Sequence, residues 1–229
     1  MSNPFRRLRS SLISAAPSRR IFLLGAAALA AGGSATASAG QDREAMRASL
    51  SEARRYYAAT HDGPFVIEAV DLKKLRPAFY RQVVDYETKE APGTVVVDTH
   101  SRFLYLTGKA GTALRYGVGI GREGFSWSGR GEILIKKIWP TWTPPAEMIR
   151  RQPELASYGS GMSPGPDNPL GARALYIYRG GVDTLYRLHG SSDVTSIGQA
   201  VSSGCVRLLQ QDIIDLYERV PEHTPIVVL

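Results

Sequence analysis

Cysteine is nearly absent from the sequence, because Cys205 is the only one in 229 residues. A chain with one cysteine cannot form an internal disulfide. Histidine is also scarce. The four histidines, at positions 61, 100, 189 and 223, show neither an H-E-x-x-H motif nor paired ligand spacing, which argues against a metal site. We therefore expect no metal ion and no other cofactor.

The sequence also lacks an apolar run long enough to span a membrane. The apolar stretch at residues 21–31 has 11 residues, whereas a spanning helix needs about 20. It follows a basic stretch that ends at Arg20 and precedes two A-x-A sites that end at Ala37 and Ala39. This order predicts a signal peptide over residues 1–39. After its removal we expect a periplasmic protein without a stable membrane anchor.

The residues around the paired arginines indicate the export route. Residues 18–23 read Ser-Arg-Arg-Ile-Phe-Leu, which resembles the twin-arginine export signal. Leu24 stands where that signal usually has lysine, so the general secretory (Sec) route stays open. No cysteine lies near the cleavage site, which argues against a lipoprotein anchor.

Acidic residues are missing from residues 1–39, which hold five arginines. This leader accounts for most of the formal net charge of +7, because the rest of the chain has 23 basic and 21 acidic residues. We therefore expect no nucleic-acid partner, since such binding needs a basic surface on the folded domain. A content of 43% hydrophobic and 21% charged residues is typical of a globular protein.

Short β-branched and apolar runs, separated by Gly- and Pro-rich turns, dominate from residue 92 onward. They favour a mainly β fold, a sandwich or a barrel-like pair of sheets with short helices. Strands are predicted at residues 94–98, 103–106, 115–120, 132–138, 174–178, 185–189 and 226–229. We expect this β domain to span residues 91–229 and residues 40–90 to be a helical and connecting segment.

Two helices are predicted from apolar periodicity. One covers residues 41–59. The other carries a buried stripe from Ile213 to Val220, with Asp212 as its N-terminal cap and Pro221 as its stop. The second helix follows the loop of the single cysteine, and we expect it to pack over the sheet and hold that loop.

Two further motifs carry little information. Residues 119–124 fit G-x-G-x-x-G, but a loop-like stretch follows instead of the helix that dinucleotide binding requires, so we predict a β-turn. Residues 139–145 read Trp-Pro-Thr-Trp-Thr-Pro-Pro. This stretch fits a recognition surface and a set of packed loop anchors equally well.

The neighbours of the single cysteine point to chemistry. In an exported protein, Cys205 is an intermolecular link, a buried small side chain or a reactive thiol. His189 ends a predicted strand 16 residues earlier, and histidine is the side chain whose pKa suits a base that activates a thiol. Activation by His189 would lower the thiol pKa below its free value. Taken alone, the pair fits a core cysteine and a structural histidine better.

Residues around this pair suit substrate binding. Gly190 and Gly204 would let the backbone approach a substrate closely. The N–H groups of Ser203, Gly204 and Cys205 would form an oxyanion hole. Arg207 would bind a carboxylate or help to ionise the thiol, and its structural alternative is an ion pair with Asp212 or Asp215. His189 needs a partner for its second ring nitrogen, and we expect a backbone carbonyl.

The whole motif resembles the catalytic signature of the L,D-transpeptidases, the YkuD domain family. The signature combines a His-Gly pair at His189, an Ile-Gly pair at Ile197, and Ser-x-Gly-Cys-hydrophobic-Arg from Ser202 to Arg207, followed by an Asp and a short helix. Weaker similarity extends from about residue 94 to residue 229. The family often has His or Lys where this chain has Ser203, which puts any auxiliary basic group there in doubt.

The resemblance implies a β-rich, sandwich-like fold and acyl transfer on peptidoglycan stem peptides for cell-wall biogenesis. Cys205 would attack the bond before the terminal D-alanine of a tetrapeptide stem, His189 would be its base, and an acceptor amine would resolve the thioester. It also implies acylation by carbapenem-type inhibitors. The sequence leaves open a cross-linking transpeptidase, an L,D-carboxypeptidase and a protein-anchoring transpeptidase. It also leaves open a non-enzymatic wall-binding or scaffolding protein.

Overall fold

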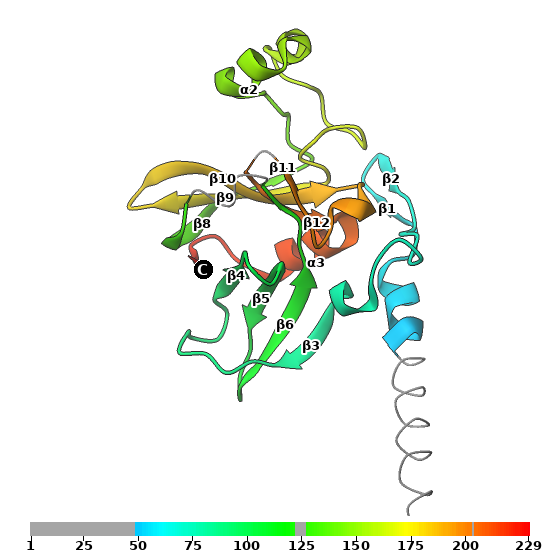
Figure 1. Ribbon diagram of the computed structural model, residues 1–229, viewed down its shortest axis with the longest axis vertical. Coiled ribbons are helices and arrows are strands. Elements are labelled where there is room, and N and C mark those ends of the chain that lie inside the picture. Colours follow the sequence, from blue (N-terminus) through cyan, green and yellow to red (C-terminus); the bar gives the residue numbers. More distant parts are fainter. Residues whose placement is uncertain (1–48, 122–126, 203) are drawn as a thin grey trace, which may run out of the picture. The chain divides into compact units, whose positions relative to one another are not determined.

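The computed structural model describes residues 49–121, 127–202 and 204–229, which lie in one compact unit, Glu44–Leu229. This part of the chain is built mainly of β-strands, as predicted (Figure 1). The predicted signal peptide, residues 1–39, lies outside the described residues. No helix within the described ranges is long and apolar enough to cross a membrane.

One large sheet dominates the fold. Its strand order is β12-β10-β9-β8-β13-β4-β5-β6-β3. The pairs β10/β12 and β13/β4 are parallel, and the other neighbours are antiparallel. The strand bounds are β3 Gln82–Asp85, β4 Val95–Asp98, β5 Phe103–Thr107, β6 Thr112–Gly117, β8 Gly129–Ile138, β9 Arg173–Arg179, β10 Val182–Ser191, β12 Val206–Leu209 and β13 Thr224–Val228.

Two small sheets complete the β structure. β1 (Thr60–Asp62) pairs antiparallel with β2 (Phe65–Ile67), and β7 (Ile120–Gly121) pairs parallel with β11 (Ala200–Ser202). The turn predicted at residues 119–124 is therefore wrong at Ile120 and Gly121, which lie in a strand, and residues 122–124 are outside the described ranges. The 3-10 helices are η1 Pro77–Phe79, η2 Pro153–Tyr158 and η3 Val194–Ser196.

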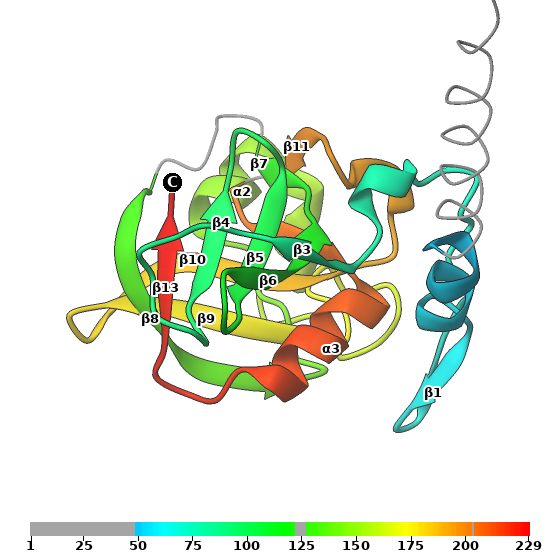
Figure 2. The ribbon, with the colours of Figure 1, turned by 90° about the horizontal axis from the view of Figure 1, so that it is seen from below.

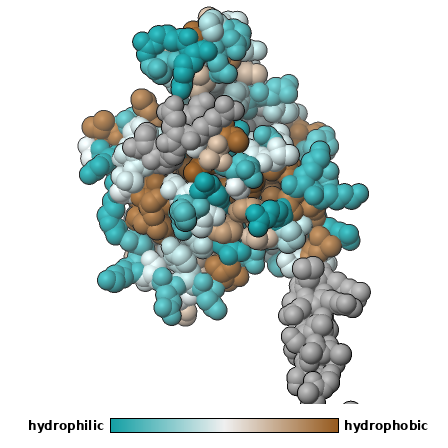
Figure 3. All heavy atoms as spheres, in the orientation of Figure 1, coloured by the Kyte–Doolittle hydropathy of each residue, from teal (hydrophilic) through white to brown (hydrophobic). Residues whose placement is uncertain are grey.

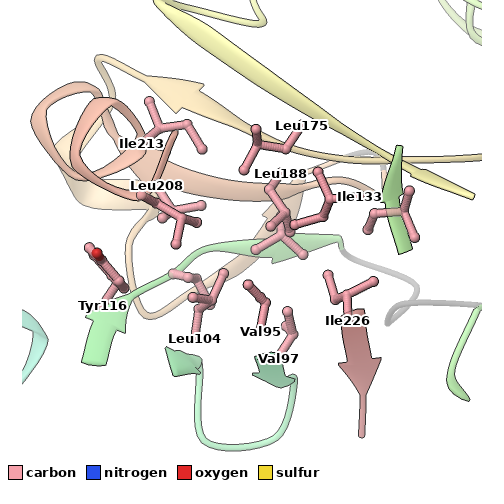
Figure 4. Close-up of a cluster of buried hydrophobic side chains, with 14 of the residues drawn as sticks. Val95, Val97, Leu104, Tyr116, Ile133, Leu175, Leu188, Leu208, Ile213 and Ile226 are labelled. Atoms are coloured by element: carbon pink, nitrogen blue, oxygen red, sulfur yellow. The ribbon is translucent and has the colours of Figure 1, made fainter. Parts of the chain in front are cut away.

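The large sheet curls around one hydrophobic core. Val95, Val97 and Leu104 come from β4 and β5, and Figure 4 shows them on one side of a core whose other side holds Leu175 and Leu188. All five side chains are completely buried. The two halves of the sheet therefore cover each other as the layers of a sandwich do, which agrees with the predicted sandwich or barrel-like arrangement.

Helix α3 (Gln210–Arg219) follows β12 directly and lies beside the sheet (Figure 2). Ile213 and Leu216 are fully buried in the core, so the predicted apolar stripe is confirmed. The predicted cap is wrong. Leu209 is the N-cap residue, and Asp212 lies in the first turn with no exposed surface. The helix ends before Pro221, because proline cannot continue it.

Residues 139–170 form an arm that connects β8 to β9 and contains α2 (Ala146–Arg151) and η2. Hydrophilic side chains cover this arm in Figure 3. At its base, Trp139 is buried, its Nε1–H donates to Asp62 Oδ2 at 2.7 Å, and its ring lies 4.4 Å from that of Phe65. Of the two readings of residues 139–145, Trp139 therefore supports the loop anchor.

Candidate active site

His189 lies near the end of β10, with 5% of its surface exposed. Its Nδ1 lies 2.9 Å from the carbonyl oxygen of Gly190. Because a carbonyl only accepts hydrogen bonds, Nδ1 carries the proton and Nε2 keeps a free lone pair. The predicted backbone partner of His189 is therefore present, and this tautomer is the one a general base requires.

Cys205 directly precedes β12, which pairs in parallel with β10. The register sets Leu188 against Val206 and His189 against Arg207. Leu188 and Val206 point into the core, where both are fully buried. Because side chains alternate along a strand, His189, Cys205 and Arg207 share the opposite face. The short parallel pair thus brings together residues that are 16 positions apart, and Cys205 remains half-buried there.

The backbone around Cys205 is packed closely. Gly204 has φ of +130°, a conformation that other residues rarely adopt. A Cβ built on Gly121 of β7 would lie 2.6 Å from the Gly204 Cα. A side chain at Gly121 would push the cysteine loop away from β7, and a side chain at Gly204 would strain the backbone. Ser203, the third residue predicted for the oxyanion hole, lies outside the described residues.

Gly190 is buried against the start of α3. A Cβ at this position would collide with the side chain of Gln210, whose Oε1 accepts a hydrogen bond from the Ala172 N–H at 2.9 Å. The Gly190 N–H donates to the Leu170 carbonyl at 3.1 Å, and its own carbonyl holds His189. These contacts support a packing and orienting function for Gly190.

Arg207 is half-buried on the face that carries His189. Its backbone N–H and carbonyl both bond to Gly119, at 2.8 and 2.9 Å. The ion-pair partners of Asp212 and Asp215 are Arg81 and Arg219. Asp212 and Asp215 therefore belong to another charge cluster, and the structure gives no support to the structural alternative considered for Arg207.

The electrostatic surroundings keep both members of the pair neutral. Burial, together with the positive charge of Arg207, lowers the pKa of His189 to about 4. Burial raises the pKa of the Cys205 thiol, although the Arg187 N–H and the charges of Arg187 and Arg207 oppose the rise. The prediction of a lowered thiol pKa is therefore wrong. A half-buried thiol loses more by giving up water than two arginines restore.

Arg187 is the residue of this site that the sequence analysis missed. It lies two positions before His189 on β10, so strand alternation places it on the same face. That spacing was the available signal.

No cluster of three or more His, Cys, Asp or Glu that would suit a metal ion occurs in the part of the chain that the structure describes.

Comparison with known proteins decides the family. The model of the L,D-transpeptidase catalytic domain, YkuD, matches residues 92–228. The chain belongs to the YkuD family. The resemblance inferred from the cysteine motif is thereby confirmed, and His189, Cys205 and Arg207 all lie inside the matched region.

Several relatives carry the name of the family. The probable L,D-transpeptidase YbiS of Escherichia coli K12 is 38% identical over 137 residues, which cover 58% of this chain and 42% of YbiS. A putative L,D-transpeptidase of Fuscovulum blasticum is 32% identical over 142 residues, covering 59% of this chain and 68% of the relative. The match therefore spans less than half the length of YbiS.

A solved chain from Brucella melitensis, described as a probable carnitine operon oxidoreductase, is 42% identical. The match covers 69% of the present chain and 99% of the Brucella chain, with a TM-score of 0.48. That description belongs to the Brucella protein alone.

Proposed function

We propose that the chain is a peptidoglycan L,D-transpeptidase in which Cys205 is the nucleophile and His189 its general base. The observation that carries the proposal is the Nδ1–H of His189 held by the Gly190 carbonyl. This hydrogen bond leaves Nε2 of His189 as the proton acceptor. His189 lies on β10, which pairs with β12, the strand that begins directly after Cys205. Membership of the YkuD family supports the same assignment.

The first half of the reaction forms a thioester. Sγ of Cys205 attacks the carbonyl carbon of the third stem residue, and the thiol proton passes to Nε2 of His189. Because the resting thiol and imidazole are both neutral, this transfer accompanies formation of the C–S bond. The C–N bond to the terminal D-alanine then breaks, and the imidazolium gives its proton to the leaving amine.

The second half regenerates the thiol. An acceptor amine attacks the thioester carbonyl and loses a proton to His189, the C–S bond breaks, and the imidazolium returns the proton to sulfur. The backbone N–H groups of Ser203, Gly204 and Cys205 stabilise the oxyanion in both halves. Arg207 binds the carboxylate of the stem, since a guanidinium recognises carboxylates in a bidentate manner.

Mass spectrometry of muropeptides tests the function and identifies the acceptor. Tetrapeptide muropeptides are incubated with wild-type protein and with Cys205→Ala. New cross-linked dimers with loss of D-alanine support the transpeptidase, and tripeptides alone support the L,D-carboxypeptidase. Transfer to an added wall-linked protein supports protein anchoring. Unchanged muropeptides with every acceptor would contradict the proposal and favour a wall-binding or scaffolding protein.

We further propose that residues 1–39 are a signal peptide that directs the protein to the periplasm, and that residues 91–229 form the catalytic domain after a helical and connecting segment at residues 40–90. The basic, apolar and A-x-A order supports the export step. N-terminal sequencing of the exported protein should give a start between about residues 38 and 40. A start at Met1 or Ser2 would contradict export by cleavage.

A further inference from the structure

Strand β10 is irregular just before the active site. Its pairing with β9 shifts register between Asp183 and Arg187. Between them, Leu185 has φ of +64°. Its side chain is 75% exposed, so packing of that side chain does not explain the conformation. Such a backbone conformation is unfavourable for leucine and persists only where its surroundings impose it. Bulges of this kind change the direction of the side chains that follow them.

Asp183 imposes this conformation. Its Oδ1 accepts the Leu185 N–H at 2.8 Å, and its two carboxylate oxygens accept from Nη1 and Nη2 of Arg187 at 2.7 and 2.8 Å. The guanidinium also lies 4.1 Å from the ring centre of Tyr176. With 14% of the Arg187 side chain exposed, its charge is held in one position.

Arg187 itself lies beside the nucleophile. The register pairs Leu188 with Val206, so one residue earlier Arg187 stands opposite Cys205, and strand alternation places both side chains on the same face. The Arg187 N–H donates to the Cys205 sulfur, and its guanidinium favours the negatively charged thiolate. The neighbouring Tyr186 ring lies 3.7 Å from where a Cβ on Gly204 would be. The groups that face the thiol are therefore Arg187, Tyr186 and His189 from β10 and Arg207 from β12.

We propose that Arg187, locked by Asp183, is a positioning residue for the nucleophile. Its N–H orients the sulfur, and its fixed positive charge stabilises the anion that develops on sulfur as His189 takes the proton. Burial disfavours the thiolate, and a cation held in a fixed position offsets this desolvation penalty. The inference rests on the proposed nucleophile, but it is tested on the thiol itself.

The test measures the rate of Cys205 alkylation by iodoacetamide as a function of pH. The single cysteine makes the signal unambiguous. Arg187→Gln removes the charge and keeps the backbone N–H. We expect alkylation at pH 7 to slow roughly tenfold and the profile to move to higher pH, because a nearby cation typically shifts a pKa by a unit or more. Arg187→Lys should lie between this variant and wild type.

Arg130→Gln is the matched control. Arg130 also holds a carboxylate with both Nη atoms, at 2.9 and 2.5 Å from Glu90, but it is not among the charges that act on the thiol. Its alkylation profile should match wild type. A wild-type profile in Arg187→Gln would overturn the proposal, even if its melting temperature fell. If Arg187→Gln does not fold, a wild-type profile in Arg187→Lys overturns it.

Turnover of tetrapeptide stems separates this inference from the proposed function. We expect Arg187→Gln to lower kcat with little change in KM, because the charge acts on the reacting sulfur and not on substrate binding. If Arg187→Gln shifts the alkylation profile but wild type shows no turnover, the positioning function of Arg187 is supported and the transpeptidase function is contradicted. If wild type turns over tetrapeptide stems but Arg187→Gln leaves the alkylation profile unshifted, the transpeptidase function is supported and the positioning function of Arg187 is contradicted.

Discussion

His189 and Cys205 form a neutral pair at rest. The buried imidazole has a pKa of about 4, and the thiol pKa is raised by burial. At neutral pH the proposed base, His189, is therefore unprotonated, and the proposed nucleophile, Cys205, still carries its proton. The site is prepared for proton transfer during attack, which differs from a preformed thiolate–imidazolium ion pair.

The low pKa of His189 predicts how stability depends on pH. The unfolded chain binds this proton near pH 6.5 and the folded chain near pH 4. The contribution to stability is therefore complete above pH 6.5 and is lost as the pH falls toward 4. At about 1.4 kcal/mol per pKa unit, the full loss is about 3.5 kcal/mol, most of which is reached by pH 4.5.

Urea unfolding of wild type and His189→Gln at pH 8 and pH 4.5 measures this loss. Glutamine does not titrate, so the other acidic groups cancel in the comparison. We expect wild type to lose about 3 kcal/mol more than the variant between the two pH values. Parallel losses in the two proteins would show that His189 is not held neutral by the fold.

Arg207 gives a second prediction at the residue scale. Arg207→Lys keeps the charge but cannot bind a carboxylate with two parallel hydrogen bonds. A hydrogen bond to a charged group contributes roughly 1.5–3 kcal/mol, so we expect turnover to fall by about tenfold or more with an almost unchanged melting temperature. A large drop in melting temperature would assign Arg207 a structural function instead.

At the scale of the elements, sequence patterns predicted the strands that have clear apolar runs and missed several short strands that lack them. β4, β5, β8, β9 and β13 lie within a few residues of their predicted positions, because β-branched runs and flanking turns mark them. β12 has four residues and no alternation that marks one face, and its pairing with the distant β10 defines it as a strand. β1 and β2 have three residues each and β3 has four, and all three depend on tertiary pairing.

The site divides in the same way. The Cys205 motif pointed to His189, Arg207 and the backbone carbonyl that orients the imidazole. The effect of Arg187 was not predicted, because it depends on a bulge that only the register of β9 and β10 reveals. The predicted direction of the shift in the thiol pKa was wrong for a related reason. The shift follows from burial, which is set by packing and not by the local sequence.

A buried charge cluster connects helix α3 to the N-terminal segment that contains Tyr57 and Arg81. Arg81 contacts Asp215 at 2.7 Å and Asp212 at 3.7 Å. The Tyr57 hydroxyl donates to Asp212 at 3.1 Å. Burial raises the pKa of Asp212 to about 7 although the Arg81 charge opposes the rise. The helix that follows the Cys205 strand therefore depends on Arg81 for charge balance.

Arg81→Leu should destabilise the protein by about 3–5 kcal/mol, because removing one partner leaves buried charge uncompensated. Arg130→Leu breaks the pair with Glu90, in which the arginine side chain is 71% exposed, and should cost much less, because solvent screens an exposed ion pair. Urea unfolding at neutral pH measures both changes. Equal effects of the two substitutions would contradict the structural importance of the buried cluster.

At the scale of the whole molecule, residues before the matched family region belong to the packed core. Tyr57, Leu75 and Phe79 form a second hydrophobic cluster with Ile197 and Leu209. Ile197 belongs to the catalytic motif, and Leu209 precedes α3. The early segment therefore packs against the elements that hold the proposed active site.

Removal of this segment should unfold the protein. Each large buried apolar side chain contributes about 1.5–3 kcal/mol, and the net stability of a domain is only about 5–15 kcal/mol. We expect a chain that begins at residue 91 to lack a cooperative thermal transition by circular dichroism, whereas one that begins at residue 40 keeps it. Equal melting temperatures would show that the segment is dispensable.

The central claim is that Cys205 is an acylated nucleophile. Intact-protein mass spectrometry after exposure to a carbapenem tests it most directly, because the opened lactam ring stays attached as an acyl group. Wild type should gain the mass of one inhibitor molecule, His189→Ala should react about 10²–10⁴-fold more slowly, and Cys205→Ala should gain no mass. An adduct on Cys205→Ala, or none on folded wild type, would contradict the claim.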